Sequence, residues 1–107
     1  MKYTKRVAEK TFRRLLKAFP IVGITGPRQS VKSTLLKHLL KDYTYVTFDD
    51  IRKVQLFEED PIGFIERYKH KVIFDEVQLV PAIFATIKMV VDQDRHNYGN
   101  FVLTGSS

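Results

Sequence analysis

The sequence predicts an α/β protein built on a parallel sheet with helices on both faces. Short apolar runs rich in β-branched residues alternate with longer segments whose apolar residues recur every three or four positions. Such alternation is typical of parallel strands joined by crossover helices. The 107 residues, 44% of them hydrophobic, suffice for one domain and not for two. We therefore expect a single partial domain over 1–107, with a helix over 1–19 and a core of about four strands over 20–107.

The first expected helix runs from Thr4 to Phe19. Thr4 can cap its N-terminus, and Pro20 ends it. Apolar side chains recur on one side of it, with the basic residues largely on the other side. The apolar stripe consists of Ala8, Phe12, Leu15, Leu16 and Phe19.

The four expected strands are compact apolar runs bounded by turn or charged residues. They cover residues 21–25, 43–48, 72–74 and 101–104. Three further helices are expected from periodicity and capping residues, over 51–58, over 60–69 and from Pro81 onward. Asp50 or Asp49 can cap the first of these and Asp60 the second. The last carries Ile83, Phe84, Ile87, Val90 and Val91 on one side.

One more helix, over 32–41, follows the first strand through a turn-rich segment. Its apolar face consists of Leu35, Leu36, Leu39 and Leu40. The turn and the start of this helix read Gly26-Pro27-Arg28-Gln29-Ser30-Val31-Lys32-Ser33, which has the spacing of a Walker A phosphate loop. In such a loop, successive backbone N–H groups and the positive helix end hold the phosphates. Lys32 would reach the β- and γ-phosphates, and the Ser33 hydroxyl would bind Mg²⁺.

Val31 is the one departure in residue type, because the pattern has glycine before the lysine. A β-branched residue forced to positive φ costs roughly 1–3 kcal/mol. Its Cβ would also crowd a phosphate oxygen. We therefore expect an impaired loop, and for this segment alone a chance strand–turn–helix stays open as the alternative.

Two other strands end in polar residues suited to phosphate chemistry. Asp75 and Glu76 follow an apolar strand in the Walker B layout, where Asp75 would hold Mg²⁺ and Glu76 would act as general base. Thr104, with Ser106 second, is the candidate sensor of the γ-phosphate at the end of the final strand. Taken singly, each segment could be an ordinary strand terminus. Together they predict a nucleotide site, because strand carboxyl ends share one edge of a parallel sheet.

Several residues have weaker claims. Asp49 and Asp50 lie at the same expected edge, though a helix cap is favoured for them, and Gln78 could orient polar groups near Glu76. Arg28 could contact phosphate without a catalytic role. The three histidines, His38, His70 and His96, lack metal-ligand spacing.

The composition narrows the possible functions further. The absence of cysteine excludes disulfides and thiolate metal sites. There is no signal peptide and no apolar run long enough to cross a membrane, so a cytoplasmic location is expected. The net charge of +6 raises the prospect of nucleic acid as a partner. The basic N-terminal helix lacks a reading motif, so a solvated face is favoured.

The motifs together resemble those of prokaryotic AAA-type ATPases, whose front domain is often followed by a C-terminal domain. The resemblance covers nearly the whole chain. The segments that carry it are Gly26-Pro27-Arg28-Gln29-Ser30 with Lys32-Ser33-Thr34, then Thr47-Phe48-Asp49-Asp50, Ile73-Phe74-Asp75-Glu76-Val77-Gln78 and Leu103-Thr104-Gly105-Ser106-Ser107. It implies ATP and Mg²⁺ as ligands, with Lys32, Ser33 or Thr34, Asp75 and Glu76 in the roles above.

Three functions follow as expectations. The favoured one is an ATP-binding domain impaired in hydrolysis by Val31 and by ending at Ser107. The alternatives are an active MgATP-hydrolysing domain coupled to a partner, and a nucleic-acid-binding module. The family's strand order also places strand 21–25 beside strand 101–104, with its other edge open to self-association.

Overall fold

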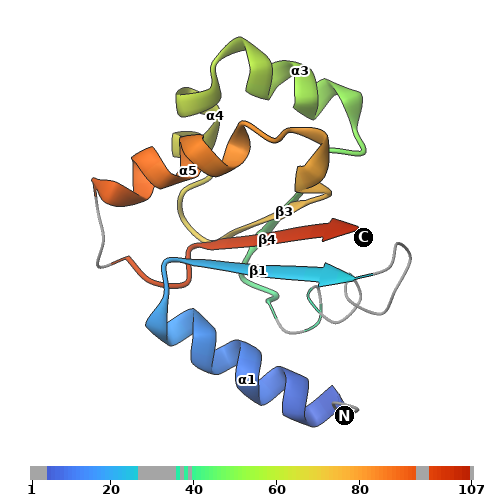
Figure 1. Ribbon diagram of the computed structural model, residues 1–107, viewed down its shortest axis with the longest axis vertical. Coiled ribbons are helices and arrows are strands. Elements are labelled where there is room, and N and C mark those ends of the chain that lie inside the picture. The colour runs from blue at the N-terminus through green and yellow to red at the C-terminus, as the bar shows by residue number, and fades with distance from the viewer. Residues whose placement is uncertain (1–4, 27–35, 37, 39, 94–96, 107) are drawn as a thin grey trace.

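The computed structural model, which describes residues 5–26, 36, 38, 40–93 and 97–106, contains a four-stranded parallel sheet (Figure 1). The strands are β1 (Ile21–Gly26), β2 (Thr44–Thr47), β3 (Val72–Asp75) and β4 (Phe101–Ser106). Their order is β1-β4-β3-β2, and every pairing is parallel. The α/β class is confirmed, as is the expected neighbourhood of the first and last strands.

Helices cover both faces of this sheet. Helix α1 (Lys5–Ala18) lies on one side, whereas α3 (Ile51–Glu59), α4 (Pro61–Arg67) and α5 (Ile83–Asp92) lie on the other (Figure 1). A short 3₁₀ turn, η1 (Val77–Leu79), connects β3 toward α5. Each face therefore has its own apolar core.

The larger core contains a cluster of aromatic rings centred on Phe74 of β3. Phe48 stacks on Phe74 with ring centroids 5.8 Å apart, and Phe64 of α4 lies 6.0 Å from it. Phe57 of α3 meets Phe48 edge-on at 6.0 Å. All four rings are buried. Aromatic pairs at these distances add about 0.5–1.5 kcal/mol beyond the area they bury, so this cluster fixes α3 and α4 on β3.

The smaller core lies on the α1 side of the sheet. Phe12 of α1 packs there against Val22 of β1 and the central-strand residues Ile73 and Val102. Leu36 and Leu40 of the expected helix over 32–41 are buried in the same cluster. Leu35, Leu39 and Thr4, which the sequence also placed in helices, lie outside the described residues.

The two predicted aspartate caps are present. The Asp50 carboxylate accepts a hydrogen bond from the Arg52 N–H at 3.0 Å, and Asp60 accepts one from the Gly63 N–H at 3.1 Å. Pro61 occupies the first turn of α4. Helix α4 ends two residues before the predicted Lys69, with Tyr68 as its C-cap.

Two predicted core positions are wrong. Phe84 is 53% exposed, because α5 turns Ile83, Ile87 and Val90 inward and the next residue after Ile83 lies about 100° round the helix. Phe19 is 52% exposed, since α1 ends at Ala18 and the chain then turns into β1. None of the helices among the described residues is long and apolar enough to span a membrane.

Candidate functional site

The carboxyl ends of the strands bring the predicted site residues to one edge of the sheet. The register pairs Gly26 of β1 with Ser106 of β4, and Thr47 of β2 with Asp75 of β3. Gly26, the first residue of the phosphate-loop motif, ends β1 at this edge. The remaining predicted phosphate-binding residues, Pro27, Arg28, Gln29, Ser30, Val31, Lys32, Ser33 and Thr34, lie outside the described residues.

Asp75 is the centre of the described part of the site. Its side chain is buried, with the residue 7% exposed, and its carboxylate accepts hydrogen bonds from three hydroxyl groups. The Thr104 hydroxyl lies 2.5 Å from Oδ1. On Oδ2, the Tyr45 hydroxyl donates at 2.7 Å and that of Thr47 at 3.0 Å. Because a carboxylate offers about four lone-pair positions, one position on Oδ1 is left unused by the described part of the chain.

Thr47 has its hydroxyl direction fixed by a second contact. The Asp49 backbone N–H donates to Thr47 Oγ1 at 3.2 Å, which leaves the Thr47 hydrogen for Asp75. Sequence reasoning gave Thr47 and Tyr45 no role in the site, although Thr47 begins one of the segments that carry the family resemblance. A second signal was their spacing, since residues two apart in a strand share a face.

Glu76 follows β3 in a left-handed backbone conformation, with φ 59° and ψ 47°. It is 4% exposed, and its carboxylate is held by two side chains. The Ser106 hydroxyl donates to Oε1 at 2.7 Å, with Oε2 3.0 Å away, and the Gln78 amide nitrogen donates to Oε2 at 2.7 Å. Ser106, the second candidate for the sensor, and Gln78, which had a weaker claim, therefore both contact the candidate general base.

The electrostatics of this cluster favour a cation. Asp75 and Glu76 are adjacent, both are buried, and all the donors named above are neutral. Among the described residues, neither carboxylate contacts a lysine or an arginine; the ion pairs Arg52–Asp50 and Lys71–Asp42 lie elsewhere. Buried carboxylates are normally paired with a cation or a metal, so the site suits a positively charged ligand group.

The chemistry of Asp75 is compatible with Mg²⁺. Its carboxylate offers oxygen ligands, which hard cations prefer, while the three hydroxyls around it act as hydrogen-bond donors to that carboxylate. No group of three or more His, Cys, Asp or Glu residues that could hold a metal is present in the described part of the chain. Mg²⁺ is usually bound through one or two carboxylates, waters and substrate phosphates rather than by a protein cage. A single lone pair of Asp75 left unused by the described residues matches that mode.

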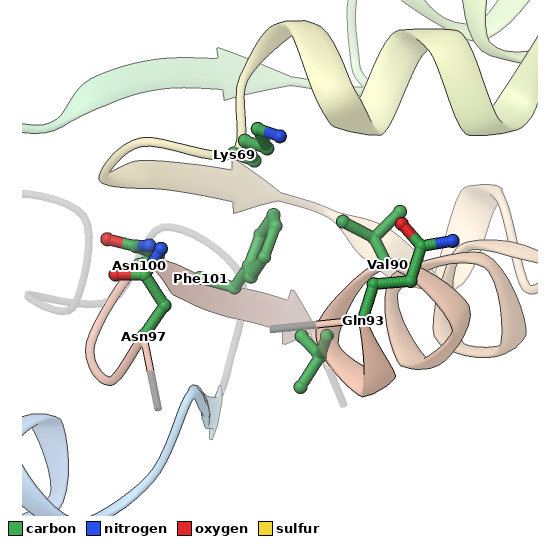
Figure 2. Close-up of a pocket in the computed structure, with 7 residues that line it drawn as sticks. Lys69, Val90, Gln93, Asn97, Asn100 and Phe101 are labelled. Atoms are coloured by element: carbon green, nitrogen blue, oxygen red, sulfur yellow. The ribbon is translucent and has the colours of Figure 1, made fainter. Parts of the chain in front are cut away.

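Two hollows, each of about 220 Å³, lie at different ends of the sheet, and one of them is lined in part by this network. One lies over the ends of β1 and β4, with Gln78 and Phe84 in its wall. The other is lined by Lys69, Asn100 and Phe101 among others, at the amino end of β4 (Figure 2). Ligands of open α/β sheets bind at the carboxyl ends of the strands, so the pocket of Figure 2 is not the candidate site.

A parallel sheet whose carboxyl edge joins a phosphate-loop motif to a buried acidic pair defines an ATPase-like nucleotide-binding domain of the P-loop class. Residues 18–107 match a family model described as an AAA domain. The chain therefore belongs to this AAA domain family, as the motif resemblance implied.

Two mycobacterial proteins are also similar to this chain. They are the uncharacterized protein Mb2031c of Mycobacterium bovis and the uncharacterized protein Rv2008c of Mycobacterium tuberculosis, each 32% identical over 90 residues. Those 90 residues are 83% of this chain and 20% of each relative, so the chain spans about a fifth of the length of these relatives. No solved structure matches the chain.

Proposed function

We propose that this domain binds MgATP at the carboxyl edge of its sheet and that Val31 weakens both binding and hydrolysis. The observation that carries the proposal is Asp75, a buried carboxylate that receives three hydroxyl donors from the described residues and lies two strands away from the strand that leads into the phosphate-loop motif. These described donors are neutral, and a buried charge normally has a cation or a metal as partner. A bound Mg²⁺ would supply such a positive charge.

Each predicted site residue would have its own role in binding and hydrolysing MgATP. Lys32 contacts the β- and γ-phosphates, and Ser33, with Thr34 beside it, offers a hydroxyl to Mg²⁺. Asp75 holds the same ion through Oδ1, directly or through water. When bound, Mg²⁺ would supply positive charge that offsets the charge on the phosphates. Glu76 would take the proton of the attacking water. Thr104, which contacts Asp75, would act as the sensor of the γ-phosphate.

Val31 is the reason to expect an impaired site. The phosphate loop needs its backbone N–H groups to curl around an anion, and glycine before the lysine allows that curvature without a Cβ. A valine forced into positive φ costs roughly 1–3 kcal/mol. That is about one to two decades of affinity. The cost arises in the loop itself, so it leaves the Asp75 network intact.

Calorimetric titration of MgATP tests this proposal directly. The chain is compared with Val31→Gly, and Lys32→Ala serves as the blank. We expect this chain to bind close to the blank and the glycine variant to bind at least about tenfold tighter. Micromolar binding by the unmodified chain, with no gain from glycine, would favour the alternative of an active MgATP-hydrolysing domain coupled to a partner.

Self-association through β1 is a second part of the proposal. β1 pairs only with β4, so its other edge is unpaired in the described sheet. Gly23 and Thr25 of this strand are exposed, and no charged residue or proline interrupts residues 21–26. Unprotected edges of this kind pair readily with another strand. A second copy of the chain could meet that edge without bringing like charges together.

A further inference from the structure

We propose that Gln78 is a positioning residue that, together with Ser106, fixes the Glu76 carboxylate for its reaction. The inference rests on the proposed function in one respect, namely that Glu76 is the general base. The position of Glu76 is set first by its backbone. Its left-handed conformation is unfavourable for a non-glycine residue, so contacts made by the folded chain must hold it in place.

Gln78 supplies one of these contacts and links it to β4. Its Nε2 donates to Glu76 Oε2 at 2.7 Å, while its Oε1 accepts from the Ser106 N–H at 3.4 Å. The amide orientation is therefore determined by both neighbours, because the reverse orientation would set oxygen against carboxylate and nitrogen against an N–H. Ser106 closes the ring by donating its hydroxyl to Glu76.

The approach of Gln78 depends on a glycine. A Cβ at position 105 would lie 3.1 Å from Gln78 Oε1, which is closer than ordinary side-chain contact. Gly105 also belongs to the polar end of β4, between Thr104, which contacts Asp75, and Ser106, which contacts Glu76. The same strand end thus holds both carboxylates, one directly and one partly through Gln78.

These contacts decide which carboxylate oxygen of Glu76 can accept a proton from water. Within the described residues, Oε2 accepts from Gln78 and, at longer range, from Ser106, whereas Oε1 accepts from Ser106. On this count Oε1 is the oxygen with a position left for a water proton. A general base must hold its acceptor atom within hydrogen-bond reach of that proton, and misplacement of a positioned group by about 1 Å can cost on the order of 100-fold in rate.

The contact itself can be tested without nucleotide. In a ¹H–¹⁵N spectrum of the chain, the Gln78 side-chain amide pair is assigned by its loss in Gln78→Leu. Glu76→Gln removes the charge of the acceptor, and a charge-assisted hydrogen bond is about twice as strong as a neutral one. We expect the Gln78 amide protons to shift and to exchange with solvent about threefold faster or more, while the amide pair of exposed Gln55 in α3 stays unchanged. If the chemical shifts and exchange rates of the Gln78 amide protons are the same in Glu76→Gln as in the parent chain, the inference is overturned.

The role is tested in the Val31→Gly background by separating binding from turnover. Gln78→Leu is expected to lower kcat for MgATP about tenfold while the Kd for MgATP changes less than about twofold. Gly105→Ala should lower kcat in the same direction, and the matched control Gln55→Leu should not. Equal kcat values for Gln78→Leu and Gln55→Leu overturn the role. If neither the unmodified protein nor Val31→Gly binds MgATP, the proposed function fails. The amide spectrum still decides whether Gln78 contacts Glu76.

Discussion

The Thr104 hydroxyl lies 2.5 Å from Oδ1 of Asp75, although 29 residues separate the two in sequence. Both side chains are buried, and the contact joins the neighbouring strands β3 and β4 at their carboxyl ends. Any rearrangement of Asp75 toward a metal would therefore be transmitted to β4. The hydrogen bond from Thr104 therefore both holds the Asp75 carboxylate and joins the ends of β3 and β4.

Removal of the Thr104 hydroxyl should destabilise the fold measurably. In Thr104→Val, the buried Asp75 carboxylate loses the one donor to Oδ1 that the described residues supply, and we expect the free energy of unfolding to fall by about 1–3 kcal/mol. Thr104→Ser should recover much of this loss. Urea unfolding measures the difference. The matched control is Thr86→Val, since the buried Thr86 hydroxyl donates to the neutral Ala82 carbonyl at 2.9 Å; an equal loss there would contradict the special role of the carboxylate.

Gly99 should not tolerate a side chain. Its φ is +73°, and a Cβ there would lie 2.8 Å from the Leu16 carbonyl oxygen at the end of α1. Gly99→Ala is therefore expected to lower the free energy of unfolding by about 1–2 kcal/mol or more, from backbone strain and the forced shift of α1. Thermal or urea unfolding measures the loss.

The control for that substitution is Gly23→Ala in β1. The nearest atom to a Cβ at Gly23 is the Leu103 carbonyl oxygen at 4.0 Å, which is ordinary contact. We expect a change within about 0.5 kcal/mol there. Similar effects at both glycines would mean that the turn at Gly99 adapts to a side chain.

Local sequence patterns predicted most of the helices and strands. They also indicated which residues of the candidate site lie at the end of a strand, but not which strands are neighbours in the sheet. Apolar periodicity located the strands, and the Asp60-Pro61 pair located the start of α4, because these signals are local. The share of β2 in the site was not predictable in this way. Tyr45 and Thr47 reach Asp75 only because β2 pairs with β3, and no residue of β2 itself encodes its neighbour.

The Asp50 cap gives a pH dependence that the chain should show in acid. The side-chain hydrogen bond from Arg52, then the backbone one, lowers the pKa of Asp50 below the ordinary 3.8. A lowered folded-state pKa means that the unfolded chain binds more protons in this window, so this contribution to stability is complete above 3.8 and is lost as the pH falls through the lower folded-state value. Asp50→Asn keeps a good cap without the charge. Between about pH 5 and pH 2, the free energy of unfolding should therefore fall less steeply with decreasing pH in the variant than in the parent chain. Equal pH dependence in the two proteins would contradict this role of Asp50.

The two edges of the sheet should respond differently to the same substitution. Thr25 of β1 and Thr44 of β2 are both exposed threonines on edge strands. Strand β2 has only residues 44–47 and is preceded by the charged Lys41 and Asp42, whereas residues 21–26 of β1 carry no charge. Lysine on an edge strand opposes pairing with another chain. Sedimentation velocity over a range of concentrations should show Thr25→Lys shifted toward monomer and Thr44→Lys unchanged, because β1 is the longer of the two edge strands and very short edge strands pair poorly with another chain. Equal sedimentation of both variants and the parent chain would contradict association through β1.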